Sequence, residues 1–248
     1  MSIVDDVRQY YQVKGIAPEN FHCKHLSDCK RDCDTFTKGQ EPYIGREYEK
    51  GTLPRLLFLS LDPVQGEFSD EDHPEQRTIE SYRAYEENVD LNFEHKGRHW
   101  YRTHEFALKI LQQFNPDLSL SDIRFCFAHA NSAKCCMHRP RNSMGDFRIF
   151  ANCREFIPGE LAALRPDIVV TQGDRAKEAV LAGFASTPSN PMQCGHSIID
   201  LGKRRVLWIH TYHPGYFRGF NHQRSECWSR WAEIAKKFIM DSAGAIPS

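Results

Sequence analysis

The sequence lacks the features that would place it in a specialised class of protein. It has no run of about 18 apolar residues, so no segment is suited to cross a membrane. The N-terminal residues 1–6 lack the basic and apolar regions of a secretory signal peptide. Internal repeats and low-complexity tracts are also missing. We therefore expect a globular, cytoplasmic protein with no membrane partner.

An excess of positive charge is missing too. The formal net charge is −1, from 32 Lys and Arg against 33 Asp and Glu. The protein as a whole does not attract nucleic acid, so any anionic partner must bind to a local basic patch. With 248 residues, 40% of them hydrophobic, the chain can form one large domain over residues 1–248 with a sizeable core. No protein partner is implied, and we expect a monomer.

Cysteine, by contrast, is abundant, with nine residues. Stable disulfides are rare in the cytoplasm, so the spacing of these residues is better read for metal binding. Six of them form two groups: Cys23, Cys29 and Cys33, and then Cys135, Cys136 and Cys153. The three others, Cys126, Cys194 and Cys227, are expected to be small core residues.

Predicted helices and strands alternate along the chain. Strands are expected at 55–61, 123–128, 166–173 and 206–209, with a short strand at 198–201 beside the last one. Helices are expected at 4–13, 75–89, 103–114, 147–164, 174–182 and 223–240. This alternation predicts an α/β fold, a three-layer α/β/α sandwich with a central, mainly parallel four-stranded sheet.

Two of these strands end in residues that could carry chemistry. The apolar run at 55–61 stops at Asp62-Pro63, and the strand at 206–209 leads to His213-Pro214. Because open α/β sheets bind their ligands at the carboxyl ends of the strands, an acid and an imidazole there would form a hydrolytic site. The structural alternatives are a turn-initiating Asp-Pro for Asp62 and a turn-capping role for His213.

Further segments follow in a fixed order. They are Asn131-Ser132-Ala133-Lys134-Cys135, then Cys153 before the strand Pro166-Asp167-Ile168-Val169-Val170-Thr171-Gln172-Gly173, and finally His213-Pro214-Gly215-Tyr216. With Asp62-Pro63, this set resembles the uracil-DNA glycosylase superfamily, particularly its iron–sulfur branch, over residues 23–218. That resemblance implies the same fold and the cleavage of an N-glycosidic bond in DNA, with an everted pyrimidine as substrate.

The resemblance also implies catalytic roles. Breaking an N-glycosidic bond leaves positive charge on the sugar and negative charge on the base, and fixed charges and dipoles stabilise both. Asp62 would stabilise the sugar and orient or deprotonate a water molecule, whereas His213 would donate a hydrogen bond to the base oxygen. The iron–sulfur branch more often has Gly-Glu-x-Pro-Gly at the first turn, so Asp62 departs from it toward the other branch.

Three residues are implied to bind the base. The amide of Asn131 offers a donor and an acceptor that match a base edge, although an Asx-turn is the structural alternative. Trp100 stands where the family has a stacking Phe, and a core tryptophan is its alternative. Val64 stands where uracil enzymes have a Tyr that blocks the 5-position of the pyrimidine.

Val64 is smaller than that Tyr, and a long insertion at about 66–97 lies next to the pocket in sequence. Both features predict a roomier site than uracil needs. We therefore expect the substrate to be uracil or a pyrimidine with a bulky 5-substituent, such as one from phage DNA.

Four thiolates suit either a Cys₄ zinc site or an iron–sulfur cluster, and spacing alone does not separate the two. The resemblance favours a 4Fe-4S cluster with zinc as the alternative. Its expected ligands are Cys29, Cys33, Cys135 and Cys153, with Cys23 able to replace Cys29 and Cys136 able to replace Cys135. Such a cluster would be structural and would fix the N-terminal segment, about 1–50, on the domain.

Contact with DNA is expected from Tyr216 and Arg218, which follow His213 in an apolar and basic tip. In the family this loop wedges into the base stack. Two rival classes stay open: a non-catalytic, metal-stabilised nucleic-acid-binding protein, and a glycosylase relative that binds DNA tightly without turnover. A cysteine hydrolase using Cys136 and His138 is disfavoured, because residues so close in sequence rarely face each other correctly.

Overall fold

The computed structural model describes residues 2–31, 36–61, 73–88, 99–137, 143–184, 186 and 190–244. Its central sheet has the strand order β2-β4-β3-β6-β8-β7. The strands are β2 (Tyr43–Ile44), β3 (Leu56–Ser60), β4 (Phe127–Asn131), β6 (Ile168–Gln172), β7 (His196–Leu201) and β8 (Arg204–Thr211). Residues of β3 and β6 are buried throughout, as expected for strands covered on both faces.

Four neighbouring strands, β4, β3, β6 and β8, pair in parallel, so the predicted four-stranded parallel sheet is confirmed. The sheet is nevertheless wider than predicted. β2 pairs antiparallel with β4 at one edge, and β7 pairs antiparallel with β8 at the other. Because β7 and β8 are joined by a short turn at Gly202, they form the hairpin expected near the C-terminus.

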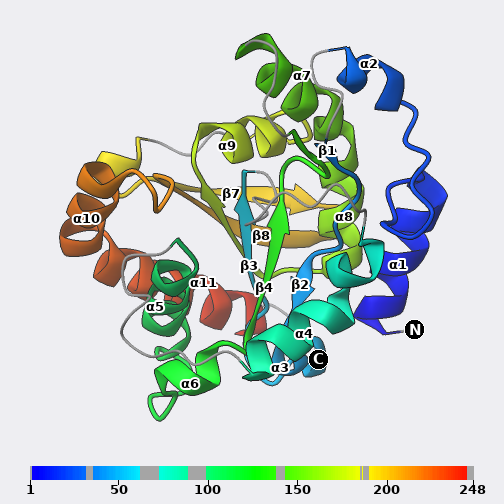
Figure 1. Ribbon diagram of the computed structural model, residues 1–248. Coiled ribbons are helices and arrows are strands. Elements are labelled where there is room, and N and C mark those ends of the chain that lie inside the picture. Colours follow the sequence, from blue (N-terminus) through cyan, green and yellow to red (C-terminus); the bar gives the residue numbers. More distant parts are fainter. Residues whose placement is uncertain are drawn as a thin grey trace.

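Helices cover both faces of the sheet, which completes the three layers (Figure 1). Four helices pack with one apolar cluster on the first face: α1 (Ile3–Lys14), α7 (Ser143–Cys153), α8 (Ile157–Leu164) and α9 (Asp174–Leu181). The opposite cluster is covered by α5 (His99–Leu111), α6 (Leu120–Ile123), α10 (Phe217–Glu226) and α11 (Trp228–Gly244). Alternate residues of β3, β4, β6 and β8 point to opposite clusters, so this part of the sheet is buried on both sides.

The described part of the chain holds further elements outside the two clusters of covering helices. They are α2 (Leu26–Lys30), α3 (Arg46–Lys50), α4 (Ile79–Asn88), the 3₁₀ turns η1 (Pro74–Arg77), η3 (Arg154–Phe156) and η4 (Pro191–Gln193), and a two-stranded sheet of β1 (Phe36–Thr37) and β5 (Cys136–Met137). Among the described residues, no helix combines the length and the apolarity that crossing a membrane requires.

The strand predicted at 123–128 is present as β4, but its predicted start at residue 123 is wrong. Ser119 and Asp122 form a reciprocal capping box that starts α6, so Ile123 ends a helix, and β4 begins only at Phe127. The helix predicted at 147–164 is interrupted by η3, and Pro158 lies in the first turn of α8, where a missing N–H is tolerated.

The expectation that Cys194 and Cys227 are core residues is confirmed, but the expectation that stable disulfides are absent is wrong. Both side chains are buried, but they form a disulfide that joins the end of η4 to the junction of α10 and α11. Cys126 agrees with its prediction, since it is a buried free thiol in the second apolar cluster.

Candidate functional site

The carboxyl ends of the parallel strands meet at one edge of the sheet. In the pairing register Ser60 lies beside Asn131, and Gln172 lies beside Thr211. Asn131 therefore ends β4 at the edge where β8 leads to His213. Asp62 and Val64 lie outside the described residues, but β3 ends at this edge as well.

Gly173 brings two of these strand ends together. Its φ of +96° is one that side chains disfavour. A Cβ placed there would lie 3.2 Å from Leu61 Cδ2 and 3.3 Å from His213 Cβ. The residue that precedes Asp62 and the residue His213 thus flank the same glycine, and a side chain at this position would push against both turns.

His213 is held in one tautomer by its own loop. The N–H of Gly215 donates to His213 Nδ1 at 3.1 Å, and the N–H of Tyr216 donates to the His213 carbonyl at 2.8 Å. A neutral imidazole whose Nδ1 accepts a hydrogen bond carries its proton on Nε2. His213 is partly exposed at this edge of the sheet.

Asn131 occupies a braced position at the end of β4. Its carbonyl accepts a hydrogen bond from Lys134 Nζ at 2.6 Å. Next to it, the hydroxyl of Ser132 donates to the carbonyls of Ser60 and Leu61 at 2.7 and 3.0 Å, which joins the ends of β4 and β3. The side chain of Asn131 is partly exposed, as a base-reading amide must be.

Trp100 packs in an aromatic cluster on the same face of the sheet as Asn131. Its ring meets His129 edge-on with centroids 4.8 Å apart and lies 5.8 Å from Tyr43, and its indole N–H donates to Glu86. The residue is partly buried, so it acts as a packing residue near the predicted base site. Its stacking role stays a prediction.

Sequence reasoning missed a chain of polar side chains beneath this edge. His129 contacts Ser60 Oγ at 2.8 Å, and Ser60 Oγ donates to Gln172 Oε1 at 2.7 Å. Gln172 Nε2 in turn donates to Thr103 Oγ1 at 3.2 Å. Buried polar groups are costly unless bonded in this way, so the chain rigidifies the ends of three strands. The only sequence signal is the break from apolar residues at the end of each strand.

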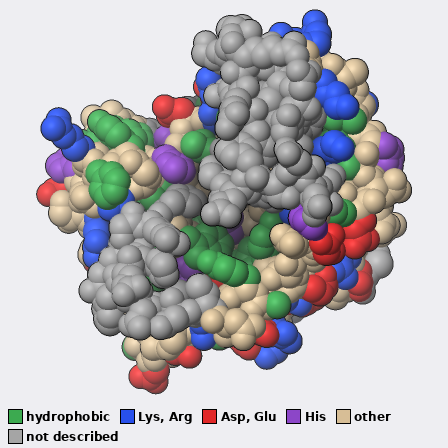
Figure 2. Space-filling view, viewed as in Figure 1, with side chains coloured by type: hydrophobic (Ala, Val, Ile, Leu, Met, Phe, Trp, Pro, Cys, Tyr) green, Lys and Arg blue, Asp and Glu red, His purple; other side chains and the backbone are tan. Residues whose placement is uncertain are grey.

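The tip after His213 presents aromatic and basic side chains to solvent. Tyr216 is 56% exposed and Phe217 is 53% exposed, and Arg218 beside them is exposed as well. Figure 2 shows hydrophobic, basic and histidine side chains next to one another over α10. Such large exposed aromatics beside positive charge are suited to bases and phosphates.

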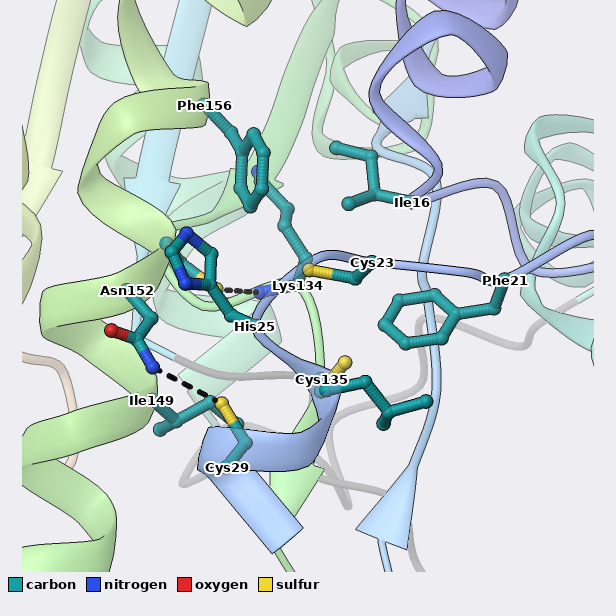
Figure 3. A pocket seen from close by; sticks show the side chains of 12 residues that line it. Ile16, Phe21, Cys23, His25, Cys29, Lys134, Cys135, Ile149, Asn152 and Phe156 are labelled. Atoms are coloured by element: carbon teal, nitrogen blue, oxygen red, sulfur yellow. Dashed lines mark hydrogen bonds between the residues drawn. The ribbon is translucent and has the colours of Figure 1, made fainter.

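The predicted metal ligands line a separate cavity (Figure 3). Cys29, Cys135 and Cys153 are all there, whereas Cys33 lies outside the described residues. The fourth thiol on the cavity wall is Cys23. The cavity thus brings together four thiols from the two cysteine groups found in the sequence.

Cys136, the alternative to Cys135, does not line this cavity. It lies in β5, where it pairs with Thr37 of β1. Its proposed partner in a hydrolase, His138, lies outside the described residues.

Each of the four thiols receives a hydrogen bond from an N–H group. The backbone N–H of Lys134 donates to Cys153 at 3.3 Å, and the side-chain amide of Asn152 donates to Cys29 at 3.5 Å. The backbone N–H groups of Gly39 and His25 donate to Cys135 and Cys23, respectively. Hydrogen bonds to sulfur favour the thiolate over the thiol. Metal-bound thiolates are stabilised by the same kind of contact.

Burial has the opposite effect from these hydrogen bonds, because it favours the neutral thiol over the thiolate. It raises the pKa of Cys153 to about 12, and burial together with the other three sulfurs raises the pKa of Cys135 well above its usual value. A cation is what would stabilise four thiolates here. Among the described residues, however, no three His, Cys, Asp or Glu side chains are grouped to hold one metal ion.

A buried charged network joins this cavity to the sheet edge. Lys134 Nζ donates to Glu160 Oε2 at 2.5 Å as well as to the Asn131 carbonyl, and the hydroxyl of Tyr11 donates to the other oxygen of Glu160. Lys134, Glu160 and Tyr11 are each at most 1% exposed. Since the backbone N–H of Lys134 bonds to Cys153, this one residue contacts both regions.

Comparison with known proteins identifies the family to which the chain belongs. No curated protein matches the chain. The family described as the Uracil DNA glycosylase superfamily matches residues 76–234. The match starts after β3 and takes in the ends of β4, β6 and β8, with Asn131, Gly173 and His213. Because it spans more than half of the sequence, the chain belongs to the uracil DNA glycosylase superfamily.

Proposed function

We propose that the protein is a DNA glycosylase that everts a pyrimidine and hydrolyses its N-glycosidic bond. The observation that carries the proposal is the hydrogen bond from the Gly215 N–H to His213 Nδ1, at the edge where Asn131 ends β4. It favours the neutral tautomer of His213 with its proton on Nε2. A neutral imidazole in this state can donate a hydrogen bond to a base oxygen as negative charge develops on it. Superfamily membership supports DNA as the substrate.

The other residues take complementary roles. Asn131 reads the base edge with its amide, and Trp100 borders the same face of the sheet through its contact with His129. Asp62, which follows Leu61 beside Gly173, stabilises the sugar and orients the attacking water. Tyr216 and Arg218 contact the DNA around the everted nucleotide.

The proposed substrate is uracil or a pyrimidine with a bulky 5-substituent. This part of the proposal rests on Val64, which is small, and on the insertion at about 66–97. A bulkier residue at this position would close the space beside the 5-position of the base.

We also propose that the cysteine cavity holds a 4Fe-4S cluster, with zinc as the alternative. Four ligands of one tetrahedral zinc would have sulfurs only about 3.8 Å apart, from Zn–S bonds of about 2.3 Å. A cluster places each of four thiolates on its own iron, and four thiols line this cavity. Cys23, Cys29, Cys135 and Cys153 would be the ligands, with Cys33 as the alternative to Cys23.

The experiment is base release from oligonucleotides, single- and double-stranded, that carry uracil, thymine, cytosine or 5-substituted cytosines. Abasic sites are detected by alkaline strand cleavage. The proposal predicts release of at least one pyrimidine, and Val64→Tyr should reduce release of 5-substituted bases more than release of uracil. Binding without release of any base would support the tight-binding alternative, and fast release of uracil alone would contradict a widened pocket.

A further inference from the structure

Arg102 of α5 is a buried arginine with no place in the function proposed so far. It is 6% exposed, so it does not reach DNA phosphates from the surface. Its guanidinium donates to the carbonyl of Pro214, the residue directly after His213. The same group lies under the ring of Phe217, with the guanidinium carbon 4.0 Å from the ring centre, and 5.8 Å from that of Phe220.

Burying this charge is unfavourable, which is why burial lowers the pKa of Arg102. The cation–π contact and the charge-assisted hydrogen bond offset that cost. Both contacts are made with the segment from Pro214 to Phe217. They therefore offset the desolvation cost of Arg102 only when this loop has the observed shape.

The loop in that shape fixes His213. The N–H of Gly215 reaches His213 Nδ1 only while Pro214 and Gly215 keep their backbone orientation. Arg102 bonds to the carbonyl of Pro214, which belongs to the same planar peptide unit as the N–H of Gly215. Tyr212 is held on the other side of His213, where its N–H donates to Gln223 Oε1 at 3.1 Å. An arginine on a separate helix therefore supports the loop shape in which Gly215 bonds to His213 Nδ1.

We propose that Arg102 is a positioning residue for His213 and for the Phe217 tip. This inference rests on the proposed function, because it assigns a partner to the histidine of that site. Lys cannot replace Arg fully here, since an ammonium group does not stack flat on a ring while it donates in a fixed fork.

The test compares Arg102→Met with Arg224→Met. Arg224 is the matched control because it also ties α10 to α5, through Glu105 at 2.7 Å, but it is exposed. In single-turnover base release, Arg102→Met should lower the rate by about 10²-fold, as expected for a displaced catalytic group. Arg224→Met should stay within a few-fold of the wild-type protein.

A spectroscopic measurement separates positioning from general stability. In protein labelled with ¹⁵N-histidine, the nitrogen shifts of His213, assigned with His213→Ala, should show a proton on Nε2 and none on Nδ1 in the wild type. Arg102→Met should give a mixture of tautomers. If Arg102→Met does not fold, Arg102→Lys carries the same two measurements and should show smaller changes in the same direction.

Unchanged His213 shifts, or a rate equal to that of Arg224→Met, would overturn the inference. The proposed function can fail separately, because a wild-type protein that releases no base would disprove the glycosylase. The tautomer comparison would then still decide whether Arg102 positions His213.

Discussion

At the scale of single residues, Gly173 determines how closely the two proposed catalytic turns approach. Its positive φ disfavours a side chain, and a Cβ at this position would push Leu61 or His213 aside by a few tenths of an ångström. Gly173→Ala should therefore reduce the rate of base release by about 10–10²-fold, because it displaces His213. Single-turnover rates measure this effect, together with urea unfolding.

Gly202 is the matched control for that substitution. Its φ is +63°, but nothing lies within 4 Å of a Cβ placed there. Gly202→Ala should cost only backbone strain, about 1 kcal/mol of unfolding free energy, and leave base release unchanged. Equal losses of activity in both variants would show that strain alone, and not the approach of the two turns, matters at Gly173.

The sequence identifies some of these residues and misses others for a physical reason. Asn131 and His213 follow visible apolar runs, and a strand end is where ligands bind in this class of sheet. Arg102 gives no such signal, because its partner Pro214 is distant in sequence and any helix can carry an arginine. The disulfide of Cys194 and Cys227 was missed because separate cysteines reveal no proximity.

At the scale of elements, the buried Lys134–Glu160–Tyr11 network fastens β4, α8 and α1 together. Lys134→Met would leave the carboxylate of Glu160 buried without its counter-charge. The unfolding free energy should fall by about 3–5 kcal/mol. Urea unfolding at neutral pH measures this loss.

The control is Lys50→Met, which removes an ion pair with Glu47 that is solvent-exposed. Exposed pairs contribute about 0–1 kcal/mol, so little change is expected. A Lys134→Met protein as stable as Lys50→Met would contradict a role for the network in joining these elements.

The end of β8 carries a buried histidine, His210, which faces Thr171, Asp174 and Lys177. Burial, helped by Lys177, lowers the pKa of His210 from 6.5 to about 4. Below about pH 6.5, His210 is protonated in the unfolded chain, whereas in the folded protein it stays neutral down to about pH 4. Stability should therefore fall by about 3 kcal/mol as the pH drops from about 6.5 to about 4.

His210→Gln should remove this part of the acid sensitivity, whereas His222→Gln, at an exposed position of α10, should not. Unfolding free energies measured across this pH range test the point. Identical pH profiles for the His210→Gln and wild-type proteins would show that His210 is not held neutral in the fold.

The elements themselves were predicted with uneven success. Long buried strands such as β3 and β6 are evident from their apolar runs. The run at 123–128 mixes apolar and polar residues without a clear period, and the capping box at Ser119 and Asp122 decides for a helical turn there. A two-residue edge strand such as β2 depends on its pairing with β4, so no local pattern in the sequence predicts it.

At the scale of the whole molecule, the cysteine cavity connects the N-terminal segment with α7 and the end of β4. If it holds a cluster, purified protein should contain about four iron and four sulfide ions per chain and absorb visible light. Cys23→Ser and Cys153→Ser should lose the iron and lower the midpoint of thermal unfolding. Iron analysis and thermal unfolding check both effects.

Cys126→Ser is the control, because Cys126 is a free buried thiol outside the cavity. Loss of iron in Cys33→Ser, with iron retained in Cys23→Ser, would reassign the fourth ligand. One zinc and no iron per chain would replace the cluster with the zinc alternative.

In the proposed function, Asp62 and His213, which follow β3 and β8, act on either side of one everted nucleotide. The most direct test of this claim is single-turnover base release, on the best substrate of the panel, by the wild type, Asp62→Asn, His213→Ala and the control His222→Ala. The account predicts losses of about 10²-fold or more for the first two variants and none for the control. Wild-type rates in both Asp62→Asn and His213→Ala would contradict it.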